Sequence, residues 1–441
     1  MLNNLFSDVY RCDGKTAIWE ITDFCNLNCI HCYHERGESV RISIESAEQT
    51  LKKLKTLGTT HIHFLGGEPL MVPNIIDILA LAKKLGFMTT INTNGTRIDD
   101  NFAQELLKTK VDFIMISMDG ASKEVNDSIR GKGVYEKVLN AINCLHRYEI
   151  TYGITITISE INAMEIGDVI GFCIKKKIPI LRIGLAYQYG NFKLNGLKRN
   201  DYRFFDELEL AIKKYRSNLL REELKIVTDF RLLPTEYINR KYGKVLQSDM
   251  AGLECHPGRD YFILASNLTV YSCLAGKELS EGIAENLDYN LDTENIASSL
   301  AVNKEYHKKF LSNYFAVCRD CNYLHLYCEP CPLYSNEDLL QCNWAKQKLH
   351  SFLTTVTEKR FLLNNGIMIC NNNLVNQEGK VLYYGNQMLV AIIREMETSK
   401  VTLGNVINEN FWPALDKKQI TEIEDAFQYM FSLGLIASSD K

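Results

Sequence analysis

One pattern repeats six times through the first 190 residues: a short run rich in β-branched residues ends near Gly or Asn, and an amphipathic stretch follows it. We expect strands at 17–22, 61–66, 88–95, 113–120, 152–159 and 180–187. Strand–helix alternation implies parallel strands joined by right-handed crossovers, which leaves a doubly wound sheet or a barrel. Polar and Gly-rich segments gather after the carboxyl ends of these strands, where barrel active sites lie. We therefore predict an α/β fold with a partial (β/α)6 TIM-type barrel at residues 1–190.

The stretches between these strands carry helix signals. In 43–57, Ser43 can cap a helix whose apolar residues share one face, and Gly58 can end it. Residues 134–149 and 162–177 repeat the pattern. Helices are therefore expected at all three places.

Beyond the barrel the pattern changes three times. We predict a helical linker at 191–250, a cysteine-rich domain at 251–345 and a small winged-helix-like domain at 356–441. In the last region we expect short strands at 360–370 and 380–385, and then helices near 386–397, 401–411 and 417–433.

Charge and composition exclude several classes of partner. The chain has 50 basic and 54 acidic residues, a formal net charge of −4, so its overall field gives no reason to expect nucleic acid as a partner. The first fifteen residues lack a signal-peptide pattern, and no apolar run approaches the roughly 20 residues that a membrane helix requires. We therefore expect a cytoplasmic protein with no membrane partner. Its fourteen cysteines then indicate metal rather than disulfides, because the cytosol keeps thiols reduced.

Three of these cysteines lie close together directly after the first expected strand. Cys25, Cys29 and Cys32 are spaced CxxxCxxC. Three such thiolates can hold three irons of a 4Fe–4S cube and leave the fourth iron without a protein ligand. The alternative is a structural zinc site, for which His31 or His34 would supply the fourth ligand.

Polar segments also follow the next strands. The segment GGEP at 66–69 exposes backbone groups beside Glu68, whose carboxylate suits an ammonium ligand. Asn94 follows the third strand in TNG, and Ser117 and Asp119 follow the fourth strand in SMDG. Taken without the cysteines, these last two segments would be ordinary turn chemistry.

With these motifs the sequence resembles a radical S-adenosylmethionine (radical SAM) enzyme. The resemblance implies that the open iron chelates SAM and that reductive cleavage yields a 5′-deoxyadenosyl radical, which abstracts hydrogen. The implied cofactor-binding residues are Tyr33, Gly66, Gly67, Glu68, Asn94, Ser117, Asp119, Arg130 and Leu185. In these roles Glu68 binds the SAM amino group, Ser117 and Arg130 its carboxylate, Asn94 and Asp119 the methionine or ribose, and Tyr33 and Leu185 the adenine. No residue is assigned as the catalytic base.

A second array of seven cysteines lies within 251–345. Its members are Cys255, Cys273, Cys318, Cys321, Cys328, Cys331 and Cys342. Zinc ribbons are the simpler interpretation, but seven thiols divide badly into sites of four. Behind a radical SAM barrel the array resembles a SPASM domain, whose two auxiliary clusters would bring the total to three 4Fe–4S clusters. The array departs from the SPASM pattern at Leu268, where a glycine is expected, and in its CX2CX6CX2C spacing.

The SPASM resemblance also implies a ligand set for each auxiliary cluster. The outer cluster would use Cys318, Cys321, Cys328 and Cys342, and the inner cluster would use Cys255, Cys273 and Cys331. The inner cluster then lacks a fourth thiolate. His256, Asp260, solvent or a substrate thiolate can fill that position, and we expect an open or exchangeable site there.

The C-terminal region suggests what the substrate is. Residues 401–441 contain three Lys, no Arg and six acidic residues, which argues against DNA binding. The element order of 356–441 resembles the domain that binds leader peptides in enzymes of ribosomally made peptides, and a domain that only docks on the cluster region has the same order. We predict an oxidoreductase-type peptide maturase of RiPP biosynthesis that forms thioether or C–C crosslinks. Its partners would be a precursor peptide, which can contain Cys, and an electron donor such as flavodoxin or ferredoxin.

Two other functions are compatible with the same motifs. One is a maturase that oxidises a Cys or Ser side chain of a protein such as a sulfatase. The other is a non-catalytic iron–sulfur scaffold for peptide binding or electron transfer, which the intact CxxxCxxC, GGEP and Arg130 argue against. His61 and His63 alternate on the second strand and receive no role.

Overall fold

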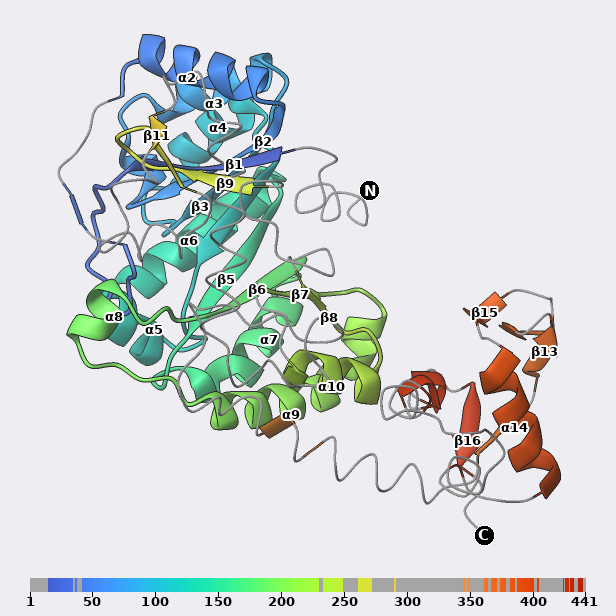
Figure 1. The fold of residues 1–441 in the computed structure, drawn as a ribbon. Coiled ribbons are helices and arrows are strands. Elements are labelled where there is room, and N and C mark those ends of the chain that lie inside the picture. Colours follow the sequence, from blue (N-terminus) through green and yellow to red (C-terminus); the bar gives the residue numbers. More distant parts are fainter. Residues whose placement is uncertain are drawn as a thin grey trace. The chain divides into compact units, whose positions relative to one another are not determined.

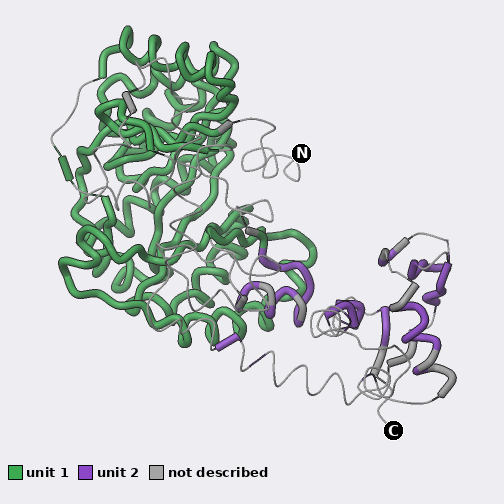
Figure 2. Tube along the Cα trace, viewed as in Figure 1, with its two compact units in different colours: residues 1–231, 247–338 green, residues 232–246, 339–441 purple. Residues whose placement is uncertain are grey.

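The computed structural model describes residues 15–34, 36–37, 42–229, 233–248, 261–271 and 289–290, and parts of 344–438. The chain divides into two compact units, coloured separately in Figure 2: unit 1 comprises 1–231 and 247–338, and unit 2 comprises 232–246 and 339–441. The seven cysteines of the second array, with His256 and Asp260, lie outside the described residues. The SPASM interpretation and the predicted domain boundaries therefore stay predictions.

Unit 1 is built on a mostly parallel sheet. Seven strands pair in series, each parallel to the next: β1 (Lys15–Thr22), β2 (Thr59–Gly66), β3 (Met88–Thr93), β4 (Phe113–Ser117), β5 (Tyr152–Ile158), β6 (Ile180–Leu185) and β7 (Lys225–Thr228). The whole sheet has the order β11-β10-β9-β1-β2-β3-β4-β5-β6-β7-β8. Its outer strands are β8 (Leu246–Ser248), β9 (Tyr261–Leu264), β10 (Thr269–Tyr271) and β11 (Tyr289–Asn290). The six expected strands are confirmed, each within a few residues of its predicted bounds.

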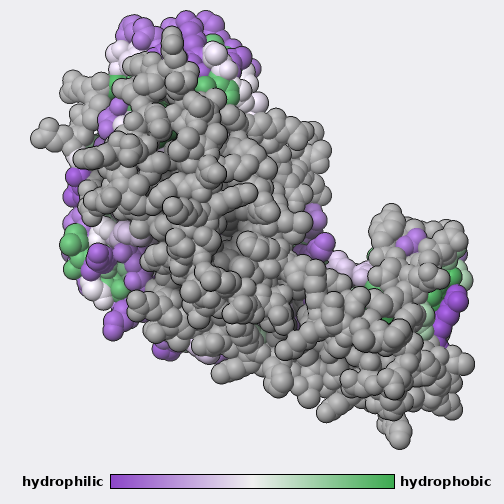
Figure 3. Space-filling view, viewed as in Figure 1, coloured by the Kyte–Doolittle hydropathy of each residue, from purple (hydrophilic) through white to green (hydrophobic). Residues whose placement is uncertain are grey.

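Helices connect the successive strands (Figure 1). They are α2 (Ile44–Thr56), α3 (Ile75–Lys84), α4 (Asp100–Thr109), α5 (Lys123–Arg130), α6 (Val134–Arg147), α7 (Ile166–Lys175), α8 (Gly190–Leu194) and α9 (Asp201–Leu220), with short 3₁₀ turns η1 (Pro69–Met71) and η2 (Ala163–Glu165). Ser43 caps α2 by accepting a hydrogen bond from the Ser46 amide at 3.1 Å, as its sequence predicts. Hydrophilic residues cover the α2–α4 end of the unit in Figure 3. No helix in the described parts of the chain is long and apolar enough to cross a membrane.

The region 191–250 differs from the predicted helical linker. Helix α9 packs against α7, and β7 then follows and joins the sheet beside β6. The strand of sequence KIVT was not predicted, because four residues are too few to show the residue alternation of a strand. It also follows a helix of 20 residues, whose longer pattern dominates the region. The described parallel series therefore contains seven strands in chain order, β1 to β7, where six were predicted, and β9 adds an eighth parallel strand beside β1.

The face of the sheet that meets the helices is almost completely buried. Alternate strand residues point to it, including Trp19, Phe64, Ile91, Ile116 and Ile156, each at 0 % exposure. Trp19 stacks on Phe64 with ring centroids 5.7 Å apart. This layer between sheet and helices is the core of unit 1, and it fixes which residues of each strand point the other way.

On the opposite face of the sheet, one group of side chains is buried and another is partly exposed to solvent. Toward the amino ends of the strands, Phe113, Met115, Ile180 and Val227 pack into a buried cluster. Further along, the side chains stay partly exposed, and strand register puts them on one face. We call this set the lumen face: Ile18, His63, Leu65, Asn92, Ser117, Thr157, Arg182 and Asp229.

Unit 2 contains a small three-stranded sheet, a second strand pair and helices. Its described elements are α10 (Leu233–Tyr242), β12 (Phe361–Leu363), β13 (Met368–Cys370), β14 (Asn373–Val375), β15 (Val381–Tyr384), α14 (Gln387–Ser399) and β16 (Ile436–Ser438). The sheet order is β13-β14-β15, and β16 pairs with β12, a contact that the sequence did not predict. Helix α14 matches the helix expected at 386–397, whereas those at 401–411 and 417–433 fall largely outside the described residues. The winged-helix assignment stays a prediction.

Leu268 adopts the backbone conformation that glycine would favour. Its φ is 66°, in the turn between β9 and β10, where its amide donates to the Ala265 carbonyl at 2.9 Å. A left-handed conformation costs an L-residue about 1–2 kcal/mol. The turn at the expected glycine position is thus formed in this chain by a leucine, despite the steric cost.

Two histidines of β2 should make the stability of the protein depend on pH. Burial lowers the pKa of His61 to about 4 and that of His63 to about 3. The unfolded chain therefore takes up protons below about pH 6.5 that the folded chain refuses, and stability falls as the pH drops toward 4. Each histidine adds a slope of up to about 1.4 kcal/mol per pH unit. We expect the double variant His61→Gln, His63→Gln to lose less stability than the unsubstituted protein between pH 6.5 and 4. Denaturant titrations across this range measure the free energy of unfolding.

The matched control is His146→Gln, because His146 is exposed on α6. That variant should lose as much stability between pH 6.5 and 4 as the unsubstituted protein does. If the free energy of unfolding of the double variant fell with pH as steeply as that of the unsubstituted protein, His61 and His63 would not be neutral imidazoles buried in the fold.

Candidate functional site

The loop after β1, residues 23–34, holds the three cysteines and rests on the backbone after β2; we call it the cysteine loop. Two main-chain bonds join them: the Gly67 amide donates to the Thr22 carbonyl at 2.7 Å, and the Glu68 amide donates to the Phe24 carbonyl at 2.8 Å. A Cβ on Gly67 would lie 2.2 Å from the Phe24 carbonyl oxygen. Only glycine permits this approach, which explains its position beside the cysteine loop.

The other side of the cysteine loop is held by α8, which the sequence analysis did not assign to the site. The Asn191 amide donates to the Cys32 carbonyl at 2.8 Å, and its side chain donates to the Cys29 carbonyl at 3.0 Å. The Asn195 side chain donates to the Ile30 carbonyl at 2.9 Å. The available signal was that these asparagines follow the sixth strand, at the same end of the barrel as the cysteines.

The three thiols share a desolvated environment. Cys29 is buried, and Cys25 and Cys32 are partly buried. Burial raises the pKa of all three thiols, that of Cys29 to about 12, and neighbouring thiolates further raise the pKa of Cys25 and Cys29. Thiolates at this place therefore require a cationic group to balance them, and loading such a group would release protons. This donor set fits an iron–sulfur cluster.

The two histidines of the zinc alternative are held by carboxylates. His31 Nε2 lies 2.6 Å from Asp119 Oδ2. His34 Nε2 lies 3.0 Å from Asp23 Oδ1, and His34 Nδ1 lies 3.5 Å from Glu20 Oε1. Within the described ranges, no three His, Cys, Asp or Glu side chains converge to hold one metal ion. Because both histidines face carboxylates instead of the thiols, their placement disfavours the zinc alternative.

Glu68 is buried at the end of β2 with its carboxylate held from two sides. Its Oε1 accepts from the Thr93 hydroxyl at 2.6 Å and the Leu70 amide at 3.0 Å, and its Oε2 accepts from the Asn94 amide at 2.7 Å. Burial raises the pKa of Glu68, and these three donors oppose the rise. A carboxylate has about four acceptor sites, so this one keeps capacity for one further donor. Gly66, at φ 128°, makes the turn that sets Glu68 in this position.

Asn94 links the end of β3 to the cysteine loop. Its side-chain nitrogen donates to Asn26 Oδ1 at 2.9 Å and lies 3.9 Å from Cys25 Sγ. Its side-chain oxygen accepts from both the amide and the hydroxyl of Thr96. The Asn94 side chain therefore contacts protein on both of its polar atoms and positions the first cysteine.

Asp119 is the fully buried centre of an ionic cluster. Its Oδ2 lies 2.6 Å from His31 Nε2 and 2.7 Å from Arg130 Nε, and its Oδ1 accepts from the Thr157 amide at 2.8 Å. Burial alone would raise the pKa of Asp119, but the Arg130 charge, His31 and the Thr157 amide together hold it well below its usual range. The cluster joins the cysteine loop, β4, α5 and β5.

The remaining predicted residues lie at the same end of the barrel. The Tyr33 ring contacts the Tyr187 ring edge to face, with centroids 5.3 Å apart, just beyond Leu185, which ends β6 and is buried. Ser117 ends β4 and is partly exposed. The Tyr33 ring therefore lies beside the chain just after β6, through Tyr187, which the sequence analysis did not name; the predicted contacts of Tyr33 and Leu185 with adenine stay predictions.

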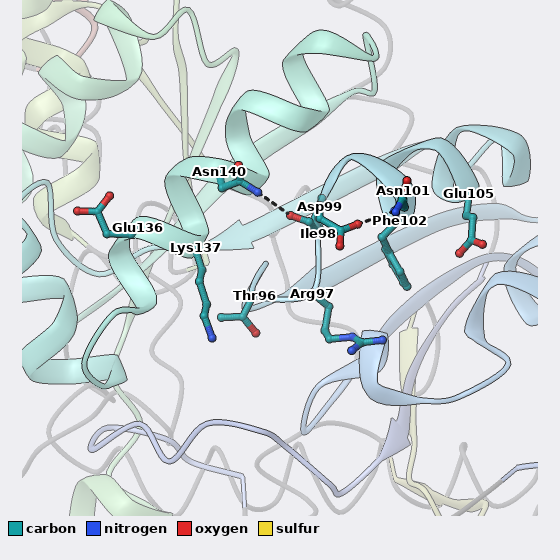
Figure 4. A pocket seen from close by; sticks show the side chains of 10 residues that line it. All are labelled: Thr96, Arg97, Ile98, Asp99, Asn101, Phe102, Glu105, Glu136, Lys137 and Asn140. Atoms are coloured by element: carbon teal, nitrogen blue, oxygen red, sulfur yellow. Dashed lines mark hydrogen bonds between the residues drawn. The ribbon is translucent and has the colours of Figure 1, made fainter.

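A separate hollow of about 520 Å³ lies on the outside of unit 1, between the loop after β3 and helices α4 and α6 (Figure 4). Its lining is polar or charged apart from Ile98 and Phe102. None of the predicted site residues lines it. We assign it no role.

Together the fold and the site define a class of protein: parallel-barrel proteins with three clustered thiols on the loop after the first strand. Residues 19–173 match the sequence profile of the radical SAM superfamily. The chain therefore contains a radical SAM domain.

Sequence relatives match this domain over part of their length. The chain is 31 % identical to the Fe-coproporphyrin III synthase of Methanosarcina barkeri over 37 % of this chain and 42 % of that protein. It is 32 % identical to the mycofactocin maturase MftC of Mycobacterium tuberculosis over 29 % of this chain and 33 % of that protein. The matched region thus spans less than half of these relatives.

Solved structures match more of the chain. SuiB of Streptococcus suis bound to S-adenosylmethionine has a TM-score of 0.56 at 17 % identity, covering 72 % of each chain. The enzyme anSMEcpe with bound AdoMet and Kp18Cys peptide has a TM-score of 0.58 at 20 % identity, covering 77 % of this chain and 96 % of that one. These similarities establish a shared α/β fold of the radical SAM barrel type.

Replacing the central carboxylate of the ionic cluster should destabilise the protein strongly. Asp119→Asn keeps the shape of the side chain but leaves Arg130 buried without its counter-charge, which typically costs about 3–5 kcal/mol. The free energy of unfolding from denaturant titration measures this loss.

The matched control is Asp100→Asn, which breaks the exposed ion pair of Asp100 with Arg147 on the helices. An exposed pair contributes little, so this variant should stay close to the unsubstituted protein. Equal losses in the two variants would mean that the Asp119 cluster does not hold the site together.

Proposed function

We propose that this protein is a radical SAM maturase that oxidises a ribosomally made precursor peptide. The observation that carries the proposal is that three clustered thiols, Glu68 and Arg130 meet at one end of a parallel barrel. The similarity to a mycofactocin maturase, and to barrel structures solved with the precursor peptide SuiA and with the Kp18Cys peptide, supports a peptide as substrate.

The cysteine loop and its neighbours would hold the cofactors. Cys25, Cys29 and Cys32 fit a 4Fe–4S cluster, and SAM bound there supplies a carbon-centred radical that abstracts hydrogen from the substrate. Glu68 keeps an acceptor site for the SAM ammonium group. Glycine backbone at Gly66 and Gly67 and side chains at Asn94, Tyr33 and Leu185 would border the rest of the cofactor.

Arg130 is well suited to bind the SAM carboxylate together with Ser117. Its Nε faces Asp119, and in the described part of the chain neither terminal nitrogen donates to a protein acceptor. A guanidinium fixed at one nitrogen presents the others as a fork that matches a carboxylate. Asp119, which is fully buried, would then act on the cofactor by positioning Arg130.

The charge of the lumen face favours a neutral peptide segment as substrate. Within that set, Arg182 is the single cation, and its Nη2 lies 3.6 Å from Asp229 Oδ2. The similarity to an Fe-coproporphyrin III synthase suggests a tetrapyrrole as the second candidate. Coproporphyrin carries several carboxylates, and one balanced arginine offers them little, so the peptide is the better fit.

The remaining predictions complete the proposal. Residues 251–345 would form a SPASM domain with two auxiliary 4Fe–4S clusters, and 356–441 would bind the leader of the precursor peptide. An electron donor such as flavodoxin or ferredoxin would reduce the barrel cluster. The product would be a thioether or C–C crosslink.

Anaerobic reconstitution tests the function directly. We expect protein loaded with iron and sulfide, given SAM, a reductant and a candidate precursor peptide from any short reading frame beside the gene, to yield 5′-deoxyadenosine and a peptide lighter by two hydrogens. Replacing Cys25, Cys29 and Cys32 together by Ala should abolish deoxyadenosine, because the thiols that would hold the barrel cluster are lost, while iron bound elsewhere stays. Liquid chromatography with mass spectrometry measures both products.

Two results would contradict the assignment. Deoxyadenosine formed by the triple variant would show that SAM is cleaved elsewhere. Conversion of coproporphyrin with no change in the peptide would favour the second candidate.

The C-terminal region should bind the leader peptide. Residues Leu374 to Ile436 contribute their own buried core, so a chain ending at Glu358 removes this core as a whole. We expect the shortened chain to cleave SAM without peptide but to bind a fluorescent leader peptide at least tenfold more weakly in anisotropy titrations. Equal affinity of both chains would favour a region that only docks on the rest of the protein.

A further inference from the structure

Four side chains on neighbouring strands form a hydrogen-bonded line beneath the lumen face. The Thr90 hydroxyl lies 2.6 Å from His63 Nδ1 and 2.8 Å from His61 Nε2. His61 Nδ1 lies 3.4 Å from the Thr16 hydroxyl. The line runs from the lumen face to partly exposed Thr16, near the start of β1.

The end of this line at the lumen face is free to meet a substrate. His63 is partly exposed, and its Nε2 has no hydrogen-bond partner among the described residues. One strand away, Asn92 Oδ1 is buried, and the described part of the chain offers it no donor. A buried polar atom without a partner costs stability unless a ligand satisfies it, so Asn92 indicates that a hydrogen-bonding group binds beside His63.

We propose that His63 accepts the proton that the peptide loses during its oxidation, and that Thr90, His61 and Thr16 pass it toward the amino ends of the strands. This inference rests on the proposed function and adds the missing base. A peptide that has lost one hydrogen atom becomes an oxidised crosslink by losing one electron and one proton. The electron leaves to a one-electron acceptor of the iron–sulfur class. The proton leaves the attacking S–H group of a thioether, or the attacked C–H carbon of a C–C crosslink, for His63 Nε2.

The transfer conserves charge along the line. As Nε2 of His63 gains a proton, its Nδ1 proton moves to Thr90, the Thr90 hydroxyl proton moves to His61 Nε2, and the His61 Nδ1 proton leaves through Thr16. Both imidazoles end neutral, with their tautomers exchanged. A Thr hydroxyl can serve between two rings because it donates one hydrogen and accepts others.

The surroundings favour passing the proton over storing it. Burial lowers the pKa of both histidines, and Arg182 on β6 further disfavours a charged His63, while Asp112 before β4 acts in the opposite direction on His61. An imidazolium would therefore not persist at neutral pH. A pair of histidines that serves packing alone needs neither a shared hydroxyl nor an exposed end.

The first experiment needs no substrate. Histidine labelled with ¹⁵N in the full-length protein reports which ring nitrogens carry protons in NMR spectra. We expect both imidazoles to be neutral at pH 7, and Thr90→Val to shift the nitrogen signals of both His61 and His63, while Thr90→Ser leaves them unchanged because it keeps the hydroxyl. A doubly protonated His63 at pH 7, or His61 signals unaffected by Thr90→Val, would overturn the relay.

The second experiment measures turnover with the peptide of the reconstitution assay. His63→Gln should make product roughly a hundredfold more slowly than the unsubstituted protein, since a positioned base contributes about 10²–10⁴. Thr90→Val should lose about tenfold and Thr90→Ser less than about twofold, on the same basis. His146→Gln, on the α6 surface, is the control and should match the unsubstituted protein.

The outcomes separate the two hypotheses. No peptide product from the unsubstituted protein counts against the proposed function, and the NMR result then decides the hydrogen-bonded line alone. Full product formation by His63→Gln, with the unsubstituted protein active, defeats the inference and leaves the proposed function intact. Equal losses in Thr90→Val and Thr90→Ser would also defeat it, because only one of them removes the hydroxyl.

Discussion

The carboxylate of Asp119 is the interaction on which the arrangement of the site depends. It is fully buried, and it joins His31 of the cysteine loop, Arg130 at the end of α5 and the Thr157 amide of β5. A buried carboxylate is tolerated only when charge and hydrogen bonds compensate its lost hydration, so the three partners must stay in place together. The position of the cysteine loop and the direction of the Arg130 guanidinium are therefore set by one group.

The sheet imposes the second constraint. Because side chains alternate, packing Trp19 and Phe64 against the helices commits Ile18 and His63 to the opposite face. A shift of one residue in the register of β2 would bury a different set of side chains against the helices. It would also turn His61 and His63 away from the face of the sheet on which they now lie. The polar lumen face is thus a consequence of the apolar core behind it.

The sequence predicted those parts of the fold that local periodicity decides. Six strands and the helix at 43–57 follow from apolar spacing and caps. Partners that meet through the fold could not be read in the same way. His31 was considered as a zinc ligand, yet it faces Asp119, which lies 88 residues away in the chain. The Asn191 side chain donates to the Cys29 carbonyl, which lies 162 residues away in the chain, and nothing in the sequence around Asn191 indicates that contact.

Asn94 and Asp119 show why a site residue can be located without its role being fixed. Both were predicted as cofactor contacts, and both lie beside the cysteine loop, where Asn94 already donates to Asn26 and Asp119 already pairs with Arg130. Sequence position identifies the end of the barrel, but the role depends on which acceptor sites remain after the protein's own contacts are made. Glu68 accepts only from neutral donors, so its charge stays available to an ammonium group, whereas the charge of Asp119 is already paired with Arg130. The terminal nitrogens of Arg130 also stay available to a ligand. The same reasoning distinguishes the two histidines of β2, since His61 is bonded through both ring nitrogens and His63 through one. Only a residue with an unused polar atom can act on a ligand, and in this chain such residues line both the cofactor end and the lumen face.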